Sequence, residues 1–210
     1  VVGADLDDPT INGEILFGSG ADLLDVRDGL VTGDVSFGAG ADTLSITGGA
    51  QVRGAITDSD GQLQVNVTNG ILDARQSGPT TISGLNIGAD GDLIVTVDPG
   101  SATAGGFIVN GTADVATGAG LGVRFTSLVN DPTRFVIVSA TTLNAGTIDQ
   151  TRLQQNSPYM YVVSAGVDNV LNQIYVDARQ RTDAEFGFIA AESATYDAFY
   201  AALAGDSELL

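Results

Sequence analysis

Residues 11–29 read Ile11-Asn-Gly-Glu-Ile-Leu-Phe-Gly-Ser-Gly-Ala-Asp-Leu-Leu-Asp-Val-Arg-Asp-Gly29, and the pattern recurs twenty residues later as Val31-Thr-Gly-Asp-Val-Ser-Phe-Gly-Ala-Gly-Ala-Asp-Thr-Leu-Ser-Ile-Thr-Gly-Gly49. The offset is the same for the glycines, for the two phenylalanines and for the two aspartates of the Gly-Ala-Asp turns. A fixed period of this length indicates stacked coils, because each short copy can bury its apolar residues only against its neighbours.

A third copy occupies residues 52–56 and 63–67, and a further echo of the Phe37 segment begins at Ile87 with an offset of 50. Apolar residues alternate in these segments, as expected of strands with one buried face. The pattern predicts that Ile11, Val31 and Val52 lie above one another inside the stack, with Phe17 on Phe37. At about 20 residues per coil, residues 1–180 would hold roughly eight or nine coils. Further strands are predicted at residues 107–109, 121–125, 135–139, 159–164 and 174–178.

The pattern changes near Tyr159. Two alternating strands flank a turn predicted at residues 165–169, which favours a hairpin closing the stack. Thr182 and Glu185 have the spacing of a capping box, and apolar residues then recur at helical spacing, predicting a helix at residues 191–204 with Gly205 as its C-terminal cap. No helical periodicity occurs earlier. The predicted fold is an all-β, right-handed parallel β-helix with a C-terminal hairpin cap and a short C-terminal α-helix.

Composition excludes several kinds of chemistry. The chain has 28 glycines, no cysteine or histidine, and a formal net charge of -18 from 26 acidic and 8 basic residues. Nucleic acid is therefore a poor partner, because binding it needs clustered cations. Without histidine, cysteine or lysine, the common triads, zinc sites and Ser-Lys chemistry are excluded. Tight turns between many short strands explain the abundant glycine.

Carboxylate chemistry is the remaining catalytic possibility. A glycosidase pair would come from Asp5, Asp7 and Asp8, or from Asp22 and Asp25, and a polysaccharide-active site would also need an arginine. Arg53 and Arg75 are the arginines near the acidic turns. The alternative is that these aspartates are solvated turn residues. We favour this alternative and predict no catalytic residue, no enzyme activity and no cofactor.

Asp22 and Asp42 raise a separate question about calcium. Both follow Gly-x-Gly-Ala turns that resemble a calcium-binding β-roll nonapeptide with phenylalanine in place of its first glycine. Stacking would bring the two carboxylates about 5 Å apart, where like charges repel unless a cation or hydrogen bonds intervene. The sequence leaves two possibilities open: a calcium site at Asp22 and Asp42, or turns in which each carboxylate accepts backbone N–H groups.

The tail permits a comparison with a known family. The strand Phe135-Val-Ile-Val-Ser-Ala140, the hairpin at Tyr159, and the segments Arg181-Thr-Asp-Ala-Glu-Phe-Gly-Phe188 and Ala194-Thr-Tyr-Asp-Ala-Phe-Tyr-Ala-Ala-Leu203 resemble the C-terminal passenger region of bacterial type V autotransporters. The resemblance implies repetitive coils at 1–104, further coils with an autochaperone-like cap at 105–180, and a helical linker at 181–210. That linker would lead toward an outer-membrane β-barrel absent from these 210 residues.

This resemblance implies a non-catalytic structural and folding role at the bacterial cell surface, or in a secreted passenger, after export through the outer membrane. Folding would start at the C-terminal cap and proceed along the coils. The expected partner is the protein's own barrel. The alternative function is an adhesin surface that binds host or neighbouring-cell molecules. The sequence predicts that Tyr196, Phe199 and Tyr200 form a helix face that packs on the last coils or inside the barrel.

Overall fold

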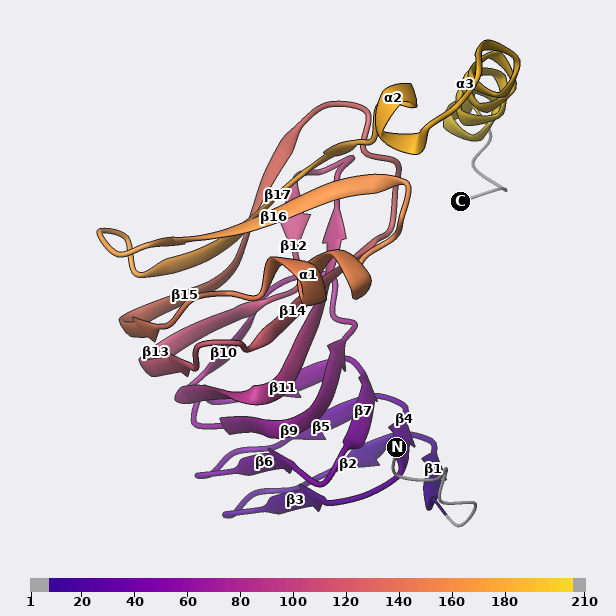
Figure 1. The fold of residues 1–210 in the computed structure, drawn as a ribbon. Helices are drawn as coiled ribbons and strands as arrows, with labels where there is room; N and C mark the ends of the chain where they lie inside the picture. Colours follow the sequence, from indigo (N-terminus) through magenta and orange to yellow (C-terminus); the bar gives the residue numbers. More distant parts are fainter. Residues whose placement is uncertain (1–7, 206–210) are drawn as a thin grey trace.

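The computed structural model describes residues 8–205 and shows a mostly β protein, with 53% of the chain in strands and 12% in three helices. One large sheet of 14 strands is mainly parallel, and a second sheet has three parallel strands. The prediction of a β-rich, repetitive fold is confirmed at this level. Figure 1 shows the strands stacked along one direction, with the N-terminal strands at one end and the last helices beyond the other.

The twenty-residue repeat corresponds to three stacks of parallel strands. Each copy adds one strand to each stack, in the same order, and the three strands of one copy with their turns are called a coil below. The first stack places Ile11 opposite Val31 and Val31 opposite Val52. The stacks are β1 (Thr10–Asn12), β4 (Leu30–Thr32) and β7 (Ala50–Gly54); β2 (Ile15–Leu16), β5 (Val35–Phe37) and β8 (Ile56–Asp58); and β3 (Leu23–Val26), β6 (Thr43–Ile46) and the start of β9 (Gln64–Ala74).

The predicted neighbours in this repeat are confirmed, with one difference at its N-terminal end. The rings of Phe17 and Phe37 stack with centroids 5.1 Å apart. Val31 and Val52 are buried, whereas Ile11 is 51% exposed. The reason is positional: β1 lies at the edge of its stack, so Ile11 has a parallel neighbour on one side only among the described residues.

Glycine at the repeated turns permits the coils to approach one another closely. A Cβ atom on Gly38 would overlap the carbonyl oxygen of Gly18, its equivalent in the preceding copy. Gly40 has the same relation to Gly20 and also a positive φ of 138°, which other residues rarely adopt. The Gly-x-Gly spacing is thus required by backbone contact between coils.

Two long strands continue the stacking past the third copy. The first part of β9 pairs with β6 and its second part with β7, and β11 (Gly84–Asp98) pairs along both parts of β9. Ile87 lies opposite Val67, which lies opposite Ile46. The echo of the Phe37 segment at Ile87 is therefore a similarity of sequence alone, because Ile87 continues the column of Ile46.

The coils lengthen in the second half of the chain. Ile87 lies opposite Val115, and Val115 lies opposite Ala145. In each of these two pairs, the residues are farther apart along the chain than Val31 and Val52, which are paired in the early coils. The predicted uniform period therefore ends after β11, since longer connections enter each coil. The strands involved are β10 (Thr80–Ile82), β12 (Thr103–Ala104), β13 (Phe107–Val115), β14 (Gly120–Phe125) and β15 (Thr133–Ala145).

The C-terminal part contains a hairpin and three helices. The predicted hairpin is confirmed as β16 (Tyr161–Asp168) and β17 (Gln173–Gln180), which pair antiparallel. Its turn lies at residues 169–172 and not at 165–169, because the Asp168 carboxylate accepts the backbone N–H groups of Val170 and Leu171. The helix α1 (Gln150–Gln155) precedes the hairpin and was not expected from the sequence.

The predicted capping box is confirmed at Thr182 and Glu185, but it opens the separate four-residue helix α2 (Asp183–Phe186). Gly187, with φ 75°, ends α2. The last helix, α3 (Ala190–Gly205), then begins one residue before its predicted start and includes Gly205. None of the described helices is both long enough and apolar enough to cross a membrane.

A single apolar core runs through the stack from Val26 to Tyr200. The largest fully buried side chains include Phe37, Phe107 and Phe135, each from a different part of the stack. Full burial of a large apolar side chain contributes about 1.5–3 kcal/mol. The coils, the hairpin and the last helix therefore share one hydrophobic interior.

Candidate functional site

The two ends of the stack differ, and the C-terminal end is the closed one. Strand β17 lies antiparallel along β15, and β16 follows β17 as the last strand of the sheet. The hairpin buries an apolar inner face made of Tyr161, Val163, Ile174, Val176 and Ala178. At the other end, three large apolar residues stay exposed: Ile11 at 51%, Leu16 at 68% and Leu23 at 62%.

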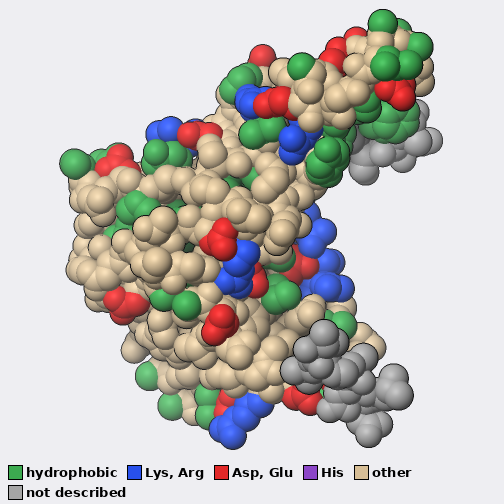
Figure 2. Space-filling model, in the orientation of Figure 1, with side chains coloured by type: hydrophobic (Ala, Val, Ile, Leu, Met, Phe, Trp, Pro, Cys, Tyr) green, Lys and Arg blue, Asp and Glu red, His purple; other side chains and the backbone are tan. Residues whose placement is uncertain are grey.

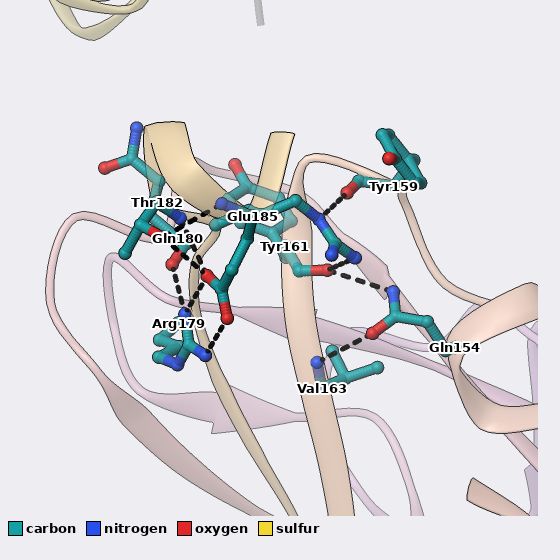
Figure 3. A network of polar contacts seen from close by, with 9 residues as sticks. Gln154, Tyr159, Tyr161, Val163, Arg179, Gln180, Thr182 and Glu185 are labelled. Carbon is teal, nitrogen blue, oxygen red and sulfur yellow. Dashed lines mark hydrogen bonds and ion pairs between the residues drawn. The ribbon is translucent and has the colours of Figure 1, made fainter. Parts of the chain in front are cut away.

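Helix α1 covers the free edge of β16 with two glutamines one helical turn apart. Gln154 donates from Nε2 to the carbonyl oxygen of Tyr161 at 3.0 Å, and its Oε1 accepts the N–H of Val163 at 3.3 Å (Figure 3). Gln150 donates in the same way to Ala165 at 3.1 Å and accepts from it at 3.0 Å. Open strand edges promote association between chains. Because each glutamine amide both donates to and accepts from the backbone of β16, the two amides take the place of a neighbouring strand and cover this edge.

Arginine contacts fix α1 to strands far earlier in the chain. Arg152 donates to the Asp92 carboxylate at 2.6 Å and to the carbonyl oxygens of Ala89 and Gly118 at 2.6 and 2.7 Å. Asn156 donates to the same carboxylate at 2.7 Å. Asp92 lies on β11, so the edge cover is attached to the body of the stack.

Two buried tyrosines form hydrogen bonds with the backbone of Val129 within residues 105–180, the segment called the cap below. The N–H of Val129 donates to the Tyr161 hydroxyl at 3.3 Å, and the Tyr200 hydroxyl donates to the Val129 carbonyl oxygen at 2.9 Å. Val129 is fully buried, so these partners replace water. Burial, followed by the Tyr161 hydroxyl, raises the pKa of Tyr200 above its ordinary value. Through Tyr200, α3 is joined to the cap.

The junction between β17 and α2 is an ordered polar network (Figure 3). Arg179 donates to both carboxylate oxygens of Glu185, at 2.8 and 2.6 Å. Thr182 donates its backbone N–H to Glu185 at 2.9 Å, and Arg181 donates from Nε to the carbonyl oxygen of Tyr159 at 2.9 Å. The Arg179 hydrogen bond, followed by the Thr182 N–H, holds the pKa of Glu185 well below its usual range.

Aromatic side chains extend this junction toward α3. Phe186 stacks on Phe188 with ring centroids 4.6 Å apart, and Tyr196 lies 5.0 Å from Phe186 and 5.9 Å from Tyr200. The predicted helix face is thus divided: Tyr196 and Tyr200 pack toward the cap, whereas Phe199 is 57% exposed. Phe199 borders a cavity of about 520 Å³ between α3 and Phe188.

The aspartates predicted from the turns lie in several environments. Asp22 and Asp42 occupy equivalent turns, and Oδ1 of the buried Asp42 accepts the backbone N–H of Asp22 at 2.8 Å. For Asp42 the observed contact is that of the hydrogen-bonded turn, and the calcium alternative is left to a melting experiment with and without the metal. Asp25 pairs with Arg27, at 2.6 Å. Asp8 is exposed, while Asp5 and Asp7 lie outside the described residues.

Comparison with known proteins does not assign the chain to a family. No protein-family model, curated protein or solved structure matches the chain. Within residues 8–205, no group of three or more Asp, Glu, His or Cys side chains is placed to hold a metal ion. The contacts within the molecule are therefore the basis for its interpretation.

Several functional candidates were not apparent from the sequence. Gln150 and Gln154 are separated by one helical turn, but their role depends on a strand edge that only the fold supplies. Arg53 and Arg75, considered above for catalysis, converge on the buried Asp73 together with Arg124 from a distant strand. The capping box was the one signal at the junction that the sequence itself carried.

Proposed function

We propose that this chain is a non-catalytic structural and folding segment of a secreted, surface-displayed bacterial passenger, and that its C-terminal cap is the template on which the remaining coils fold. The observation that carries this proposal is the difference between the two ends of the stack. The hairpin end is closed by a buried apolar face and by the glutamine-covered edge of β16. The described strands at the other end leave apolar side chains exposed, whereas the exposed apolar residues of the hairpin, Val170 and Leu171, lie in its turn and not on its strands.

The coil architecture that fits this role is a right-handed parallel β-helix. Successive copies visit the three parallel stacks in the same order, β1-β2-β3, β4-β5-β6 and β7-β8-β9. Connections between parallel strands of one sheet are nearly always right-handed. In such an array each coil contacts mainly its neighbours, so a stable end can start folding that then spreads by adding coils.

The proposed location is the bacterial cell surface or the medium, reached through the outer membrane. An acid-rich chain without cysteine suits export as an unfolded polypeptide, and the tail resembles that of autotransporter passengers. We propose the protein's own C-terminal barrel as the partner of the exposed face of α3 and the residue before it, where Phe199 and Ile189 are 57% and 66% exposed.

Pulse-labelling hydrogen exchange during refolding of the whole chain tests the order of folding. Amides of β13, β15 and β17 should gain protection before those of β4, β5 and β6, because the capped end forms first. Protection that begins at the N-terminal strands, or at both ends together, would show that the cap is not the template.

Two truncations of the same chain provide a second test. A chain ending at residue 104 should become protease-sensitive, because β11 would lose β13 and β14 and the cap would be gone. A chain beginning at residue 30 loses only the first coil, and it should stay protease-resistant and refold at the rate of the parent. If both truncations had the same effect, the special role of the cap would be refuted.

The adhesin alternative gains no specific support from the described surface. An adhesive face would be favoured by an aromatic stripe on the coils. The exposed aromatic side chains of the described residues are Tyr159 and Phe199, and both belong to the cap and the last helix. The folding role is therefore the one we propose.

A further inference from the structure

Three arginines from separate strands converge on one buried carboxylate. Oδ2 of Asp73 lies 2.7 Å from Arg124, 3.0 Å from Arg75 and 3.3 Å from Arg53. The Asp73 side chain is 6% exposed, whereas the three arginine side chains are 39–45% exposed. We call these four residues the arginine cluster. One negative charge is thus shared by three positive ones, and the guanidinium groups still face solvent.

The rest of the protein makes this sharing unusual. The chain holds 26 acidic residues and only 8 basic ones. Four of the five other arginines each pair with an acid of their own: Arg27, Arg134, Arg152 and Arg179. Acidic residues are abundant, so a shortage of acidic partners does not explain why three arginines share one carboxylate. Their like charges repel one another at this distance. A second anion among the guanidinium groups would relieve this repulsion.

Strand register produces the cluster. Arg53 on β7 lies directly opposite Asp73 on β9, and Arg75 follows two residues later on the same face. On the far side, Thr96 of β11 lies opposite Arg124 of β14. Thr96 is short, and its hydroxyl turns to the carbonyl oxygen of Ala74 at 3.2 Å. Space therefore remains between Arg75 and Arg124 for both to reach Asp73.

Most donor groups of the cluster are unused within the described part of the chain. The side-chain hydrogen bonds of Arg75 and Arg124 there all go to Oδ2 of Asp73. Nε of Arg53 is buried and makes no hydrogen bond among the described residues. Each guanidinium carries five N–H donors in a planar fork that matches phosphate oxygens.

A cavity adjoins the cluster at Arg124. It has a volume of about 320 Å³ and is lined by Arg124, Ile94, Val123 and residues 155–158, which form the end of α1 and the loop after it. Figure 2 shows blue and red side chains gathered on the indented side of the molecule, below the C-terminal helices. The cavity is small, so it suits the body of a compact ligand.

We propose that Arg53, Arg75 and Arg124 bind the phosphoryl group of a small, soluble phosphate monoester, while Asp73 orients the guanidinium groups and the neighbouring cavity holds the rest of the ligand. Three guanidinium groups and one carboxylate leave two positive charges. A phosphate monoester carries about −1.5 to −2 charges near pH 7, which matches this excess better than a carboxylate does. This proposal does not depend on the folding role.

The net charge of the chain decides between two sources of such a group. At -18 the protein repels an extended anionic surface, so a membrane bearing phosphoryl headgroups is disfavoured. A small ligand experiences mainly the local field of the arginine cluster, since charges farther than about 8–10 Å are screened in physiological salt. The ligand is therefore placed in solution and not in a bilayer.

Calorimetric titration of the full chain with glucose 6-phosphate, at constant ionic strength near pH 7.5, tests the site. The parent should bind saturably, and glucose or acetate should not. R75Q and R124Q should each weaken binding about tenfold or more, because each removes charged hydrogen bonds to the ligand. R27Q is the matched control, since Arg27 is exposed and its one ion pair among residues 8–205 is with Asp25; the variant loses the same charge and should bind like the parent.

Circular dichroism of R75Q and R124Q should match that of the parent, because both side chains are partly exposed, and a loss of binding in a folded variant is then assigned to the site. A cluster that only stabilises the strands would give no saturable binding in the parent, which would overturn the proposal. Equal weakening in R27Q, or binding to phosphatidic acid vesicles without binding to the soluble ester, would also overturn it.

Discussion

Single residues in this protein are constrained mainly by contact between successive coils. Gly38 and its equivalent Gly18 have similar sequence surroundings. A side chain at Gly38 would nevertheless meet the backbone of the preceding coil, while one at Gly18 would meet none of the described residues. The repeat shows that glycine recurs at these positions. Only the stacking order shows which copy needs it.

Gly38→Ala should lower the free energy of unfolding by about 1–3 kcal/mol, the usual range for overpacking a tight site. Gly18→Ala is the control and should change it little, because no atom of the described residues lies within 4 Å of its added Cβ. Denaturant titration of the two variants measures the difference. Equal stability would mean that the coils do not approach each other as described.

Asp42 allows a prediction about metal dependence. Its Oδ1 already accepts a backbone N–H from Asp22, whereas its Oδ2 is buried and makes no hydrogen bond among the described residues. Because no metal-holding group of carboxylates surrounds it within residues 8–205, we expect the same melting temperature with millimolar calcium as with a chelator. A melting temperature that rises with calcium in the parent, but not in Asp42→Asn, would instead establish the calcium site.

At the scale of elements, the cap depends on side chains that complete a sheet edge. Helix α1 is short and carries no apolar periodicity, which is why it was not predicted. Its role follows from position: Gln150 and Gln154 lie along β16, and Arg152 attaches to β11. The hairpin was predictable from alternation, but the cover on its edge was not.

Replacing both Gln150 and Gln154 by alanine should expose the edge of β16. The two glutamines make four neutral hydrogen bonds with β16. Each contributes about 0.5–1.5 kcal/mol, so we expect a loss of about 2–6 kcal/mol in the free energy of unfolding. Amide exchange at Val163 and Ala165, measured by NMR, should accelerate in the double variant. Gln155→Ala, an exposed position on the same helix, should leave both rates unchanged.

The junction of β17 and α2 should respond to pH. The pKa of Glu185 is lowered in the folded protein, so its contribution to stability is present above the ordinary carboxyl range and is lost as the pH falls toward the folded pKa. Glu185→Gln should therefore be less stable than the parent at pH 7, and the difference should shrink on acidification below about pH 4. Unfolding titrations across this range measure it; a constant difference would contradict the assignment.

At the scale of the whole molecule, one core of the described residues passes through all coils. A core substitution in one coil therefore changes the folding or unfolding rate in a way that depends on when that coil forms. Leu44 and Leu121 are matched probes, because both are fully buried leucines in parallel strands at opposite ends of the stack. The coils around Leu44 keep the short period, whereas those around Leu121 belong to the longer, capped end.

Leu44→Ala and Leu121→Ala should each cost about 2–5 kcal/mol of stability. If folding starts at the cap, Leu121→Ala should mainly slow refolding, and Leu44→Ala should mainly accelerate unfolding. Stopped-flow kinetics of both variants separate the two effects. The reverse pattern would mean that the N-terminal coils form first.

The repeat, the parallel registers of the first three copies, the hairpin and the capping box were all predictable from the amino-acid sequence, because each rests on local periodicity or on a turn motif. The lengthened coils, the helix α1, the column in which Ile87 lies, and the convergence of three arginines on Asp73 emerged only in the folded chain. These features depend on which distant strands become neighbours. Strand stacking brings Arg53 and Arg124 from separate parts of the chain to one carboxylate, and no local pattern encodes that meeting.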